Sequence, residues 1–179
     1  GMGRFSSFAI SNYSNITKVT IADLNEDNAK EFSNFFDDRF TGIGLDVTDK
    51  EHLEKVMSGH DIVLNTTGPF FKFGLPILKS AIKCKCHYFD ICDDWEPTEE
   101  MLKLNDEALK NEITAIVGLG ASPGISNLLG LKAMNELDKT ESIITGWDVS
   151  SAKPEDESSQ KGTNAAMAVS YTHLRAHET

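Results

Sequence analysis

Residues 61–70, DIVLNTTGPF, decide the fold. The apolar run from Ile62 to Leu64 has no helical period, and Gly68-Pro69 ends it abruptly. A short apolar run bounded by turn residues indicates a strand buried on both faces, as the strands of parallel sheets are. Small polar groups and a rigid turn then stand at the carboxyl end of this strand, and ligands bind at that edge in open α/β sheets.

The segments around this strand alternate between strand and helix patterns. Further strands are predicted at residues 18–23, 40–47, 87–91 and 113–119. Helices are predicted around residues 5–10, 26–36, 49–57, 74–84, 97–112 and 124–137. Repeated alternation of this kind is typical of the α/β class, with a doubly wound parallel sheet and helices on both faces.

Composition narrows the function classes. The 179 residues are 40% hydrophobic, which is enough for one globular domain with a core. The net charge of -11 comes without a basic stripe, which argues against nucleic acid as a partner, and no apolar run approaches the roughly 20 residues of a membrane span. Three crowded cysteines, Cys84, Cys86 and Cys92, argue against a disulfide framework, so we expect a cytoplasmic protein.

An acid at a strand end suggests a nucleotide. In dinucleotide-binding folds the second strand ends in Asp or Glu about 20 residues after a glycine turn, where the carboxylate binds the adenosine ribose hydroxyls. Asp23 lies at that distance from Gly3. A carboxylate there repels a 2′-phosphate, and Leu24 and Asn25 supply no cation, so NAD is favoured over NADP. The alternative is that Asp23 only caps the next helix.

The glycine turn itself is incomplete. Of a full G-x-G-x-x-G turn, only the last glycine would be present, as Gly3. This glycine is the one that allows the helix to pack closely on the strand. The alternative is that glycines near a terminus occur by chance. If the interpretation is right, the first strand is missing, and because that strand is central in the order 3-2-1-4-5-6, the strands ending at Asp23 and Asn65 each lose a partner. We therefore expect the chain as written to bind cofactor weakly and to be inactive by itself.

Two further segments are candidate cofactor contacts. Asp46 ends a strand at LDVTD, where it either approaches the adenine or simply initiates the next helix. The loop after the opening strand would run under the nicotinamide ribose, with Pro69 fixing the turn, unless it is an ordinary strand-helix connection. The loop residues proposed as cofactor contacts are Asn65, Thr66, Gly68, Pro69 and Phe70.

The densest polar cluster, HYFDICDDW, follows another strand. Carboxylates beside an aromatic ring could orient an ammonium-bearing substrate or take a proton. We assign Asp90 and Tyr88 as candidate catalytic residues and Asp93 as a substrate-side residue. The alternative is a solvated acidic loop in a protein that is already strongly acidic.

The segment 118–127, GLGASPGISN, joins a strand to a helix. Free amides and the dipole at the start of that helix favour an anionic group, such as a substrate carboxylate or the carboxamide end of the cofactor. The alternative is a helix cap without a ligand. The substrate-side candidates here are Ser122, Pro123, Gly124, Ser126 and Asn127.

A metal site is not predicted. Cys84, Cys86, His87 and Cys92 lack the second matched pair of ligands that zinc sites use. His173 and His177 have i,i+4 spacing but lie in AAMAVSYTHLRAHET, which resembles a peptide translated from adaptor sequence. Residues 169–179 are therefore excluded from the fold prediction.

Taken together, NTTGPF, GLPILKSAIKCKCHYFDICDDW and LNDEALKNEITAIVGLGASPGISNLL resemble the nucleotide-binding region of the saccharopine dehydrogenase-like oxidoreductases, over about residues 1–137. The resemblance implies a Rossmann domain that binds NAD or NADP, and a separate α/β domain that closes over the substrate and forms a homodimer. It also implies hydride transfer between nicotinamide and the CH–NH or imine carbon of an amino-acid-like substrate.

The resemblance also implies roles and boundaries. Gly3 matches the last fingerprint glycine, Asp23 the ribose acid, Asp46 the adenine-side acid and residues 68–70 the nicotinamide-side loop, while Asp90 and residues 122–126 match positions near the substrate. Residues 1–140 would form the incomplete Rossmann domain, and 141–150, with a strand predicted at 142–149, would begin the substrate domain. Residues 151–179 would be a linker-like, non-native tail.

Two other functions remain open from the sequence. One is a non-catalytic dinucleotide-binding domain that senses redox state. The other is a Rossmann-type epimerase or reductase of the short-chain kind, which is disfavoured because its Tyr-x-x-x-Lys pair is not found.

Overall fold

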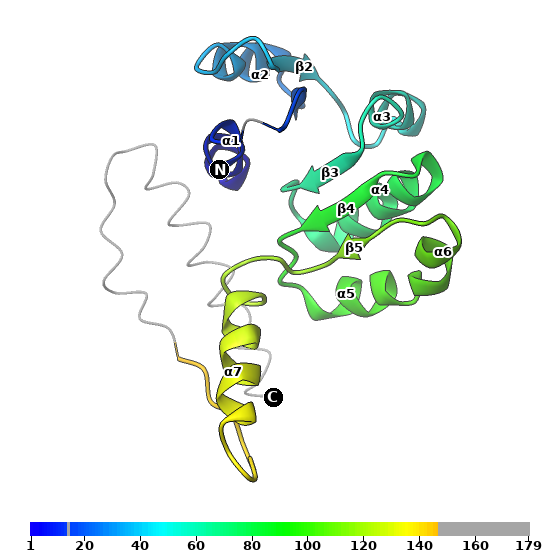
Figure 1. The fold of residues 1–179 in the computed structure, drawn as a ribbon. Coiled ribbons are helices and arrows are strands. Elements are labelled where there is room, and N and C mark those ends of the chain that lie inside the picture. The colour runs from blue at the N-terminus through cyan, green and yellow to red at the C-terminus, as the bar shows by residue number, and fades with distance from the viewer. Residues whose placement is uncertain (14, 147–179) are drawn as a thin grey trace. The chain divides into compact units, whose positions relative to one another are not determined.

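The computed structural model describes residues 1–13 and 15–146 (Figure 1). Residues 2–138 form one compact unit, and the described residues 139–146 lie outside it. The predicted strand at 142–149 lies partly outside the described residues, and its described part, 142–146, carries no strand. The proposed tail at 151–179 lies wholly outside them.

Helices and strands alternate along the compact unit. The strands are β1 (Val19–Asp23), β2 (Phe40–Gly44), β3 (Ile62–Asn65), β4 (His87–Asp90) and β5 (Ala115–Ile116). The helices are α1 (Met2–Ser11), α2 (Glu26–Ser33), α3 (Lys50–Met57), α4 (Phe70–Cys84), α5 (Trp95–Leu102), α6 (Asn105–Lys110) and α7 (Ile125–Asn135). No helix among the described residues is both long enough and apolar enough to cross a membrane.

All strand pairing is parallel. β1 pairs with β2 in one sheet, and β3, β4 and β5 pair in that order in a second sheet. This is the order of a doubly wound sheet with the central strand left out, since no described strand is hydrogen-bonded between β1 and β3. The predicted fold class, a Rossmann-like α/β sheet lacking its first strand, is confirmed.

Contacts other than sheet pairing connect the N-terminal segment to the rest of the unit. Thr20 on β1 and His60, just before β3, are hydrogen-bonded through Oγ1 and Nε2 at 2.8 Å. The Arg39 guanidinium donates to the carbonyl oxygens of Ser11, Tyr13 and Ile16 at 2.7–3.0 Å, so it holds the end of α1 at the start of β2. One of these acceptors, the Ser11 carbonyl oxygen, belongs to the last residue of α1, where the end of a helix leaves carbonyls without partners.

The local signals predicted most helix starts. Asn25 caps α2 and Asp49 caps α3, each by accepting from a backbone amide three residues later, as expected from their short polar side chains. α4 begins at Phe70 rather than at residue 74, because Pro69 serves as its N-cap and Gly74 is tolerated inside the helix, where it packs against Met101. The helix expected at 97–112 is two helices, α5 and α6, separated by a turn at Leu104.

One prediction about β3 was wrong. This strand was expected to be buried on both faces, but Ile62 is 56% and Leu64 38% exposed, whereas Asn65 is 3% exposed. Successive side chains of a strand point to opposite faces, so Ile62 and Leu64 share a face that no described element covers. The covered face packs onto α4, whose Leu78 and Ala81 are almost completely buried (Figure 1).

The packing of α2 on β2 gives a test of the fold. A methyl group at Gly42 would lie 2.2 Å from the Ala29 carbonyl oxygen, so Gly42→Ala forces helix and strand apart. We expect this substitution to lower the free energy of unfolding by about 1–3 kcal/mol in urea titrations followed by circular dichroism. Gly59→Ala is the control, because its methyl would meet only ordinary contacts, the nearest at 3.7 Å. Equal stability of the two variants would contradict the close approach.

Candidate functional site

The carboxyl ends of β3, β4 and β5 meet at one edge of the three-stranded sheet. Asn65, the last residue of β3, is in register with Asp90, the last residue of β4. The chain leaving β5 reaches the same place, because the Leu119 amide donates to the Asp90 carbonyl oxygen at 2.7 Å. Of the residues singled out in the sequence, the structure therefore brings together Asn65, Tyr88, Asp90 and the start of the 118–127 segment.

A buried hydrogen-bond network joins these residues. Asn65 Nδ2 donates to Tyr88 Oη at 3.0 Å, and Tyr88 Oη donates to Asp90 Oδ2 at 2.8 Å. Asp90 Oδ1 accepts from the backbone amides of Cys92 at 3.0 Å and Gly118 at 2.8 Å. Both Tyr88 and Asp90 have 0% exposure, so their polar atoms are satisfied entirely within the protein.

The environment of Tyr88 keeps its phenol protonated. Burial, and after it the charge of Asp90, raise the pKa of Tyr88 well above its ordinary value. A phenol in this state does not accept a proton near neutral pH. The catalytic roles assigned to Asp90 and Tyr88 from the sequence stay predictions, with both side chains enclosed by the core.

The 118–127 segment forms a compact turn after β5. Gly118 has φ +75, and a side chain there would collide with the ring of Pro123 at 2.8 Å. The Gly120 amide donates to the Pro123 carbonyl oxygen, and the Ile125 amide donates back to the Gly120 carbonyl oxygen, both at 3.0 Å. These bonds close the turn at the first residue of α7.

The first turn of α7 is partly satisfied by its own side chains. Asn127 Oδ1 accepts from the Gly124 amide at 3.0 Å and lies 3.3 Å from Ser126 Oγ. Ser122 and Asn127 are exposed, while Pro123, Gly124 and Ser126 are partly buried. The helix-cap alternative therefore describes the local contacts, and the substrate-side role of these residues, like that of the exposed Asp93, stays a prediction.

The loop between β3 and α4 is anchored by Asn65. Its Oδ1 accepts from the Thr67 amide at 2.9 Å, which leaves Nδ2 for Tyr88. A side chain at Gly3 would lie 2.9 Å from Thr66 Oγ1, so the first turn of α1 closely approaches this loop. Gly68 has open space around its Cα, and Phe70 is buried at the start of α4.

Of the two acids predicted for the adenosine side, Asp23 is the last residue of β1, and Asp46 lies two residues after β2. Asp23 is exposed and accepts from the Asn25 amide through Oδ1 at 2.9 Å. Asp46, also exposed, accepts from the amide and the hydroxyl of Thr48 through Oδ1 at 2.8 and 2.7 Å. Each carboxylate thus shapes the turn before the next helix through one of its two oxygens.

Sequence reasoning missed the contacts that matter most to Asp90. The amides of Cys92 and Gly118 were not foreseen as its partners, although the alternation of β4 could have placed Tyr88 and Asp90 on one face with Asn65 opposite. The three cysteines are free, and among the described residues no group of three or more His, Cys, Asp or Glu side chains could hold a metal ion. Burial raises the pKa of the Cys86 and Cys92 thiols.

Asp46 offers a test by pH. The hydrogen bond from the Thr48 hydroxyl, more than any other cause, holds the pKa of the Asp46 carboxyl below its ordinary value. Thr48→Ala should move this pKa back toward the ordinary value, as measured by NMR titration of the carboxyl carbon, and Thr41→Ala should not. Because the folded pKa is lowered, the stabilisation by Asp46 is present above the unfolded pKa and is lost as the pH falls through the folded one. An unchanged pKa in Thr48→Ala would contradict the assigned contact.

Comparisons with known proteins identify the family. Residues 1–116 match the family model of the saccharopine dehydrogenase NADP binding domain. The chain is 29% identical over 105 residues to the saccharopine dehydrogenase [NADP(+), L-glutamate-forming] of Schizosaccharomyces pombe, covering 59% of this chain and 22% of that protein. It is 31% identical over 97 residues to the Saccharomyces cerevisiae protein of the same name, covering 54% and 21%.

A solved structure extends the likeness to the fold. The apo histidine-tagged saccharopine dehydrogenase (L-Glu forming) from Saccharomyces cerevisiae superposes with a TM-score of 0.65 at 26% identity, covering 75% of this chain and 28% of that one. The chain thus spans between a fifth and a third of the length of these relatives. It belongs to the family of saccharopine dehydrogenase NADP-binding domains.

Proposed function

We propose that this chain is the cofactor-binding part of an NAD(P)-dependent oxidoreductase that transfers hydride between nicotinamide and the CH–NH or imine carbon of an amino-acid-like substrate. The family match over residues 1–116 carries the proposal, because it covers the segment from α1 to β5 whose strand ends form the site. The relatives named above are saccharopine dehydrogenases, which supports a substrate of this class.

The described residues fit a dinucleotide. The first turn of α1 reaches the loop after β3 so closely that Gly3 leaves no room for a side chain, which suits the close packing of helix and strand beneath a pyrophosphate. Asp23 uses one carboxylate oxygen in its own turn, and the second would accept from the adenosine ribose hydroxyls. Asp46 would lie on the adenine side, and the 65–70 loop on the nicotinamide side.

The residues at the carboxyl ends of β4 and β5 would face the substrate. The bound nicotinamide supplies the chemistry, by accepting or giving up a hydride. The turn at residues 118–124 and the start of α7 would orient the substrate carboxylate through backbone amides. Asp93 would contribute charge for an ammonium group.

The choice between the two cofactors is a finer proposal. The family is named for NADP, whereas this chain has Asp23 followed by Leu24 and Asn25 at the end of β1. A carboxylate fixed at that strand end disfavours a 2′-phosphate by like-charge repulsion. We propose that this member accepts a cofactor with a free 2′-hydroxyl at least as well as one with a 2′-phosphate.

The remaining organisation follows the same proposal. The compact unit Met2–Asp138 supports a cofactor domain ending near residue 140. A substrate and dimerisation domain would begin at 141–150. The whole protein would be a homodimer. Three free cysteines support a reducing, cytoplasmic location.

Asp23→Ser tests the cofactor assignment. Serine still accepts from the Asn25 amide but removes the charge, so we expect about tenfold weaker binding of NADH and a shift of preference toward NADPH in fluorescence titrations. Asp27→Ser, in the exposed first turn of α2, is the matched control and should leave both affinities unchanged. Unchanged affinities in Asp23→Ser would remove Asp23 from the cofactor site.

The reaction itself is tested with the whole protein. We expect the absorbance of the reduced nicotinamide to rise when oxidised NAD or NADP is supplied together with saccharopine, lysine or another diamine. Cofactor binding without turnover on any of these substrates would instead favour the non-catalytic regulatory domain.

A further inference from the structure

We infer that Asp90 is a positioning residue that ties the cofactor-side loop to the substrate-side turn through a buried network, rather than a group that exchanges protons with substrate. This inference rests on the proposed function for the roles of the two segments. The network itself is a feature of the described residues and can be tested without it.

The hydrogen-bond donors that the structure describes around Asp90 all belong to the protein. Its Oδ1 accepts from two backbone amides, those of Cys92 and Gly118, and its Oδ2 accepts from Tyr88 Oη. Its exposure is 0%, so a substrate would have to displace part of the core to reach it. Three donors fixed by the protein around one buried carboxyl group suit an anchor better than a proton shuttle.

The donor and the acceptor of each hydrogen bond that links Asn65, Tyr88 and Asp90 can be assigned. Because Asn65 Oδ1 accepts from the Thr67 amide, Nδ2 must be the atom that faces Tyr88. Tyr88 Oη therefore accepts from Asn65 and gives its own hydrogen to Asp90. Only an acceptor fits at Asp90 Oδ2, which explains why an acid stands there and an amide would not serve.

The two ends of this network lie in different segments of the site. At one end Asn65 holds the Thr67 amide, which shapes the loop leading into α4. At the other end Asp90 holds Gly118, whose left-handed conformation starts the turn that Pro123 closes. If the 65–70 loop or the 118–124 turn moves, the hydrogen bonds of Tyr88 and Asp90 that hold the other segment change as well. The two segments are therefore held by the same buried network.

Two substitutions separate positioning from proton transfer in the whole protein. Asp90→Asn keeps an oxygen for the two amides but turns an NH₂ toward Tyr88, and Tyr88→Phe breaks the connection between Asn65 and Asp90. Both should raise the Michaelis constants for cofactor and substrate, by about tenfold. The apparent pKa values that define the acidic and basic limbs of the pH profile of kcat should be the same as in the wild type. Loss of one limb in Asp90→Asn, with unchanged Michaelis constants, would overturn the inference and restore Asp90 as an acid or base.

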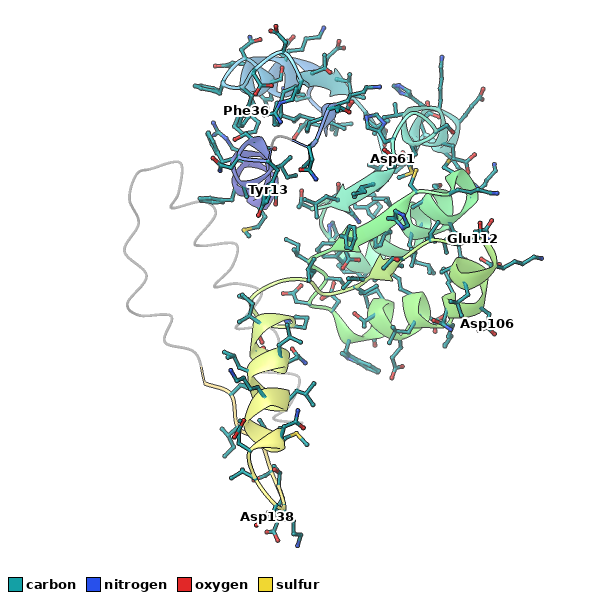
Figure 2. The ribbon with its side chains drawn as sticks, viewed as in Figure 1. Tyr13, Phe36, Asp61, Asp106, Glu112 and Asp138 are labelled. Carbon is teal, nitrogen blue, oxygen red and sulfur yellow. The ribbon has the colours of Figure 1, made fainter. Side chains whose placement is uncertain are left out.

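Hydrogen exchange gives a second readout that does not require turnover. We expect faster amide exchange in both variants at residues 65–70 and at residues 118–124 together, measured by mass spectrometry of the whole protein. Asp106→Asn on α6 and Tyr13→Phe beyond α1 are matched controls at exposed positions (Figure 2). Exchange that rises in only one of the two segments, or in neither, would overturn the coupling.

The two experiments distinguish the possible failures. If the whole protein binds no dinucleotide yet both segments loosen together in Tyr88→Phe, the proposed function fails and the network stands. If it binds and turns over the cofactor but the segments respond independently, the network inference fails alone. Should Asp90→Asn not fold, Tyr88→Phe decides between these outcomes, since it leaves both amide contacts of Asp90 Oδ1 in place.

Discussion

The cost of burying a charged carboxylate shapes the centre of this domain. Removing Asp90 from water is unfavourable by several kcal/mol unless donors surround it. Tyr88 Oη and the Cys92 amide supply two of these donors, and the returning chain after β5 supplies the Gly118 amide. The conformation of β4, of the turn that follows it and of the chain after β5 must therefore all be correct for these donors to meet at Asp90.

Much of the fold was predictable because its signals are local. Apolar runs ending in turn residues marked the strands, and the short polar residues Asn25 and Asp49 cap α2 and α3 close to where those helices were expected to begin. The parallel direction of the strands also followed from the alternation of elements, since consecutive parallel strands need crossover connections, usually helices. The pairing of β1 with β2, and of β3 with β4 and β5, agrees with that reasoning.

What sequence reasoning missed depends on neighbours far along the chain. The exposure of Ile62 and Leu64 reflects what lies beside and above β3, which no window of sequence contains. The sequence showed that Asp90 belongs to a cluster of acidic residues. Its contact with Gly118 depends on how the chain returns after β5, and its contact with Cys92 depends on the turn after β4. Asp23 was placed correctly at the end of a strand, whereas β2 ends at Gly44, two residues before Asp46. The use of both acids within their own turns needed coordinates.

The uncovered side of β3 has a consequence for handling the protein. Along the described chain, this strand pairs only with β4, so its other edge offers amides and carbonyls beside the exposed side chains of Ile62 and Leu64. A strand edge of this composition is a template on which another extended peptide can add. Self-association of the 179-residue chain through β3 would therefore grow with concentration, and charged residues substituted on that edge would keep preparations monomeric.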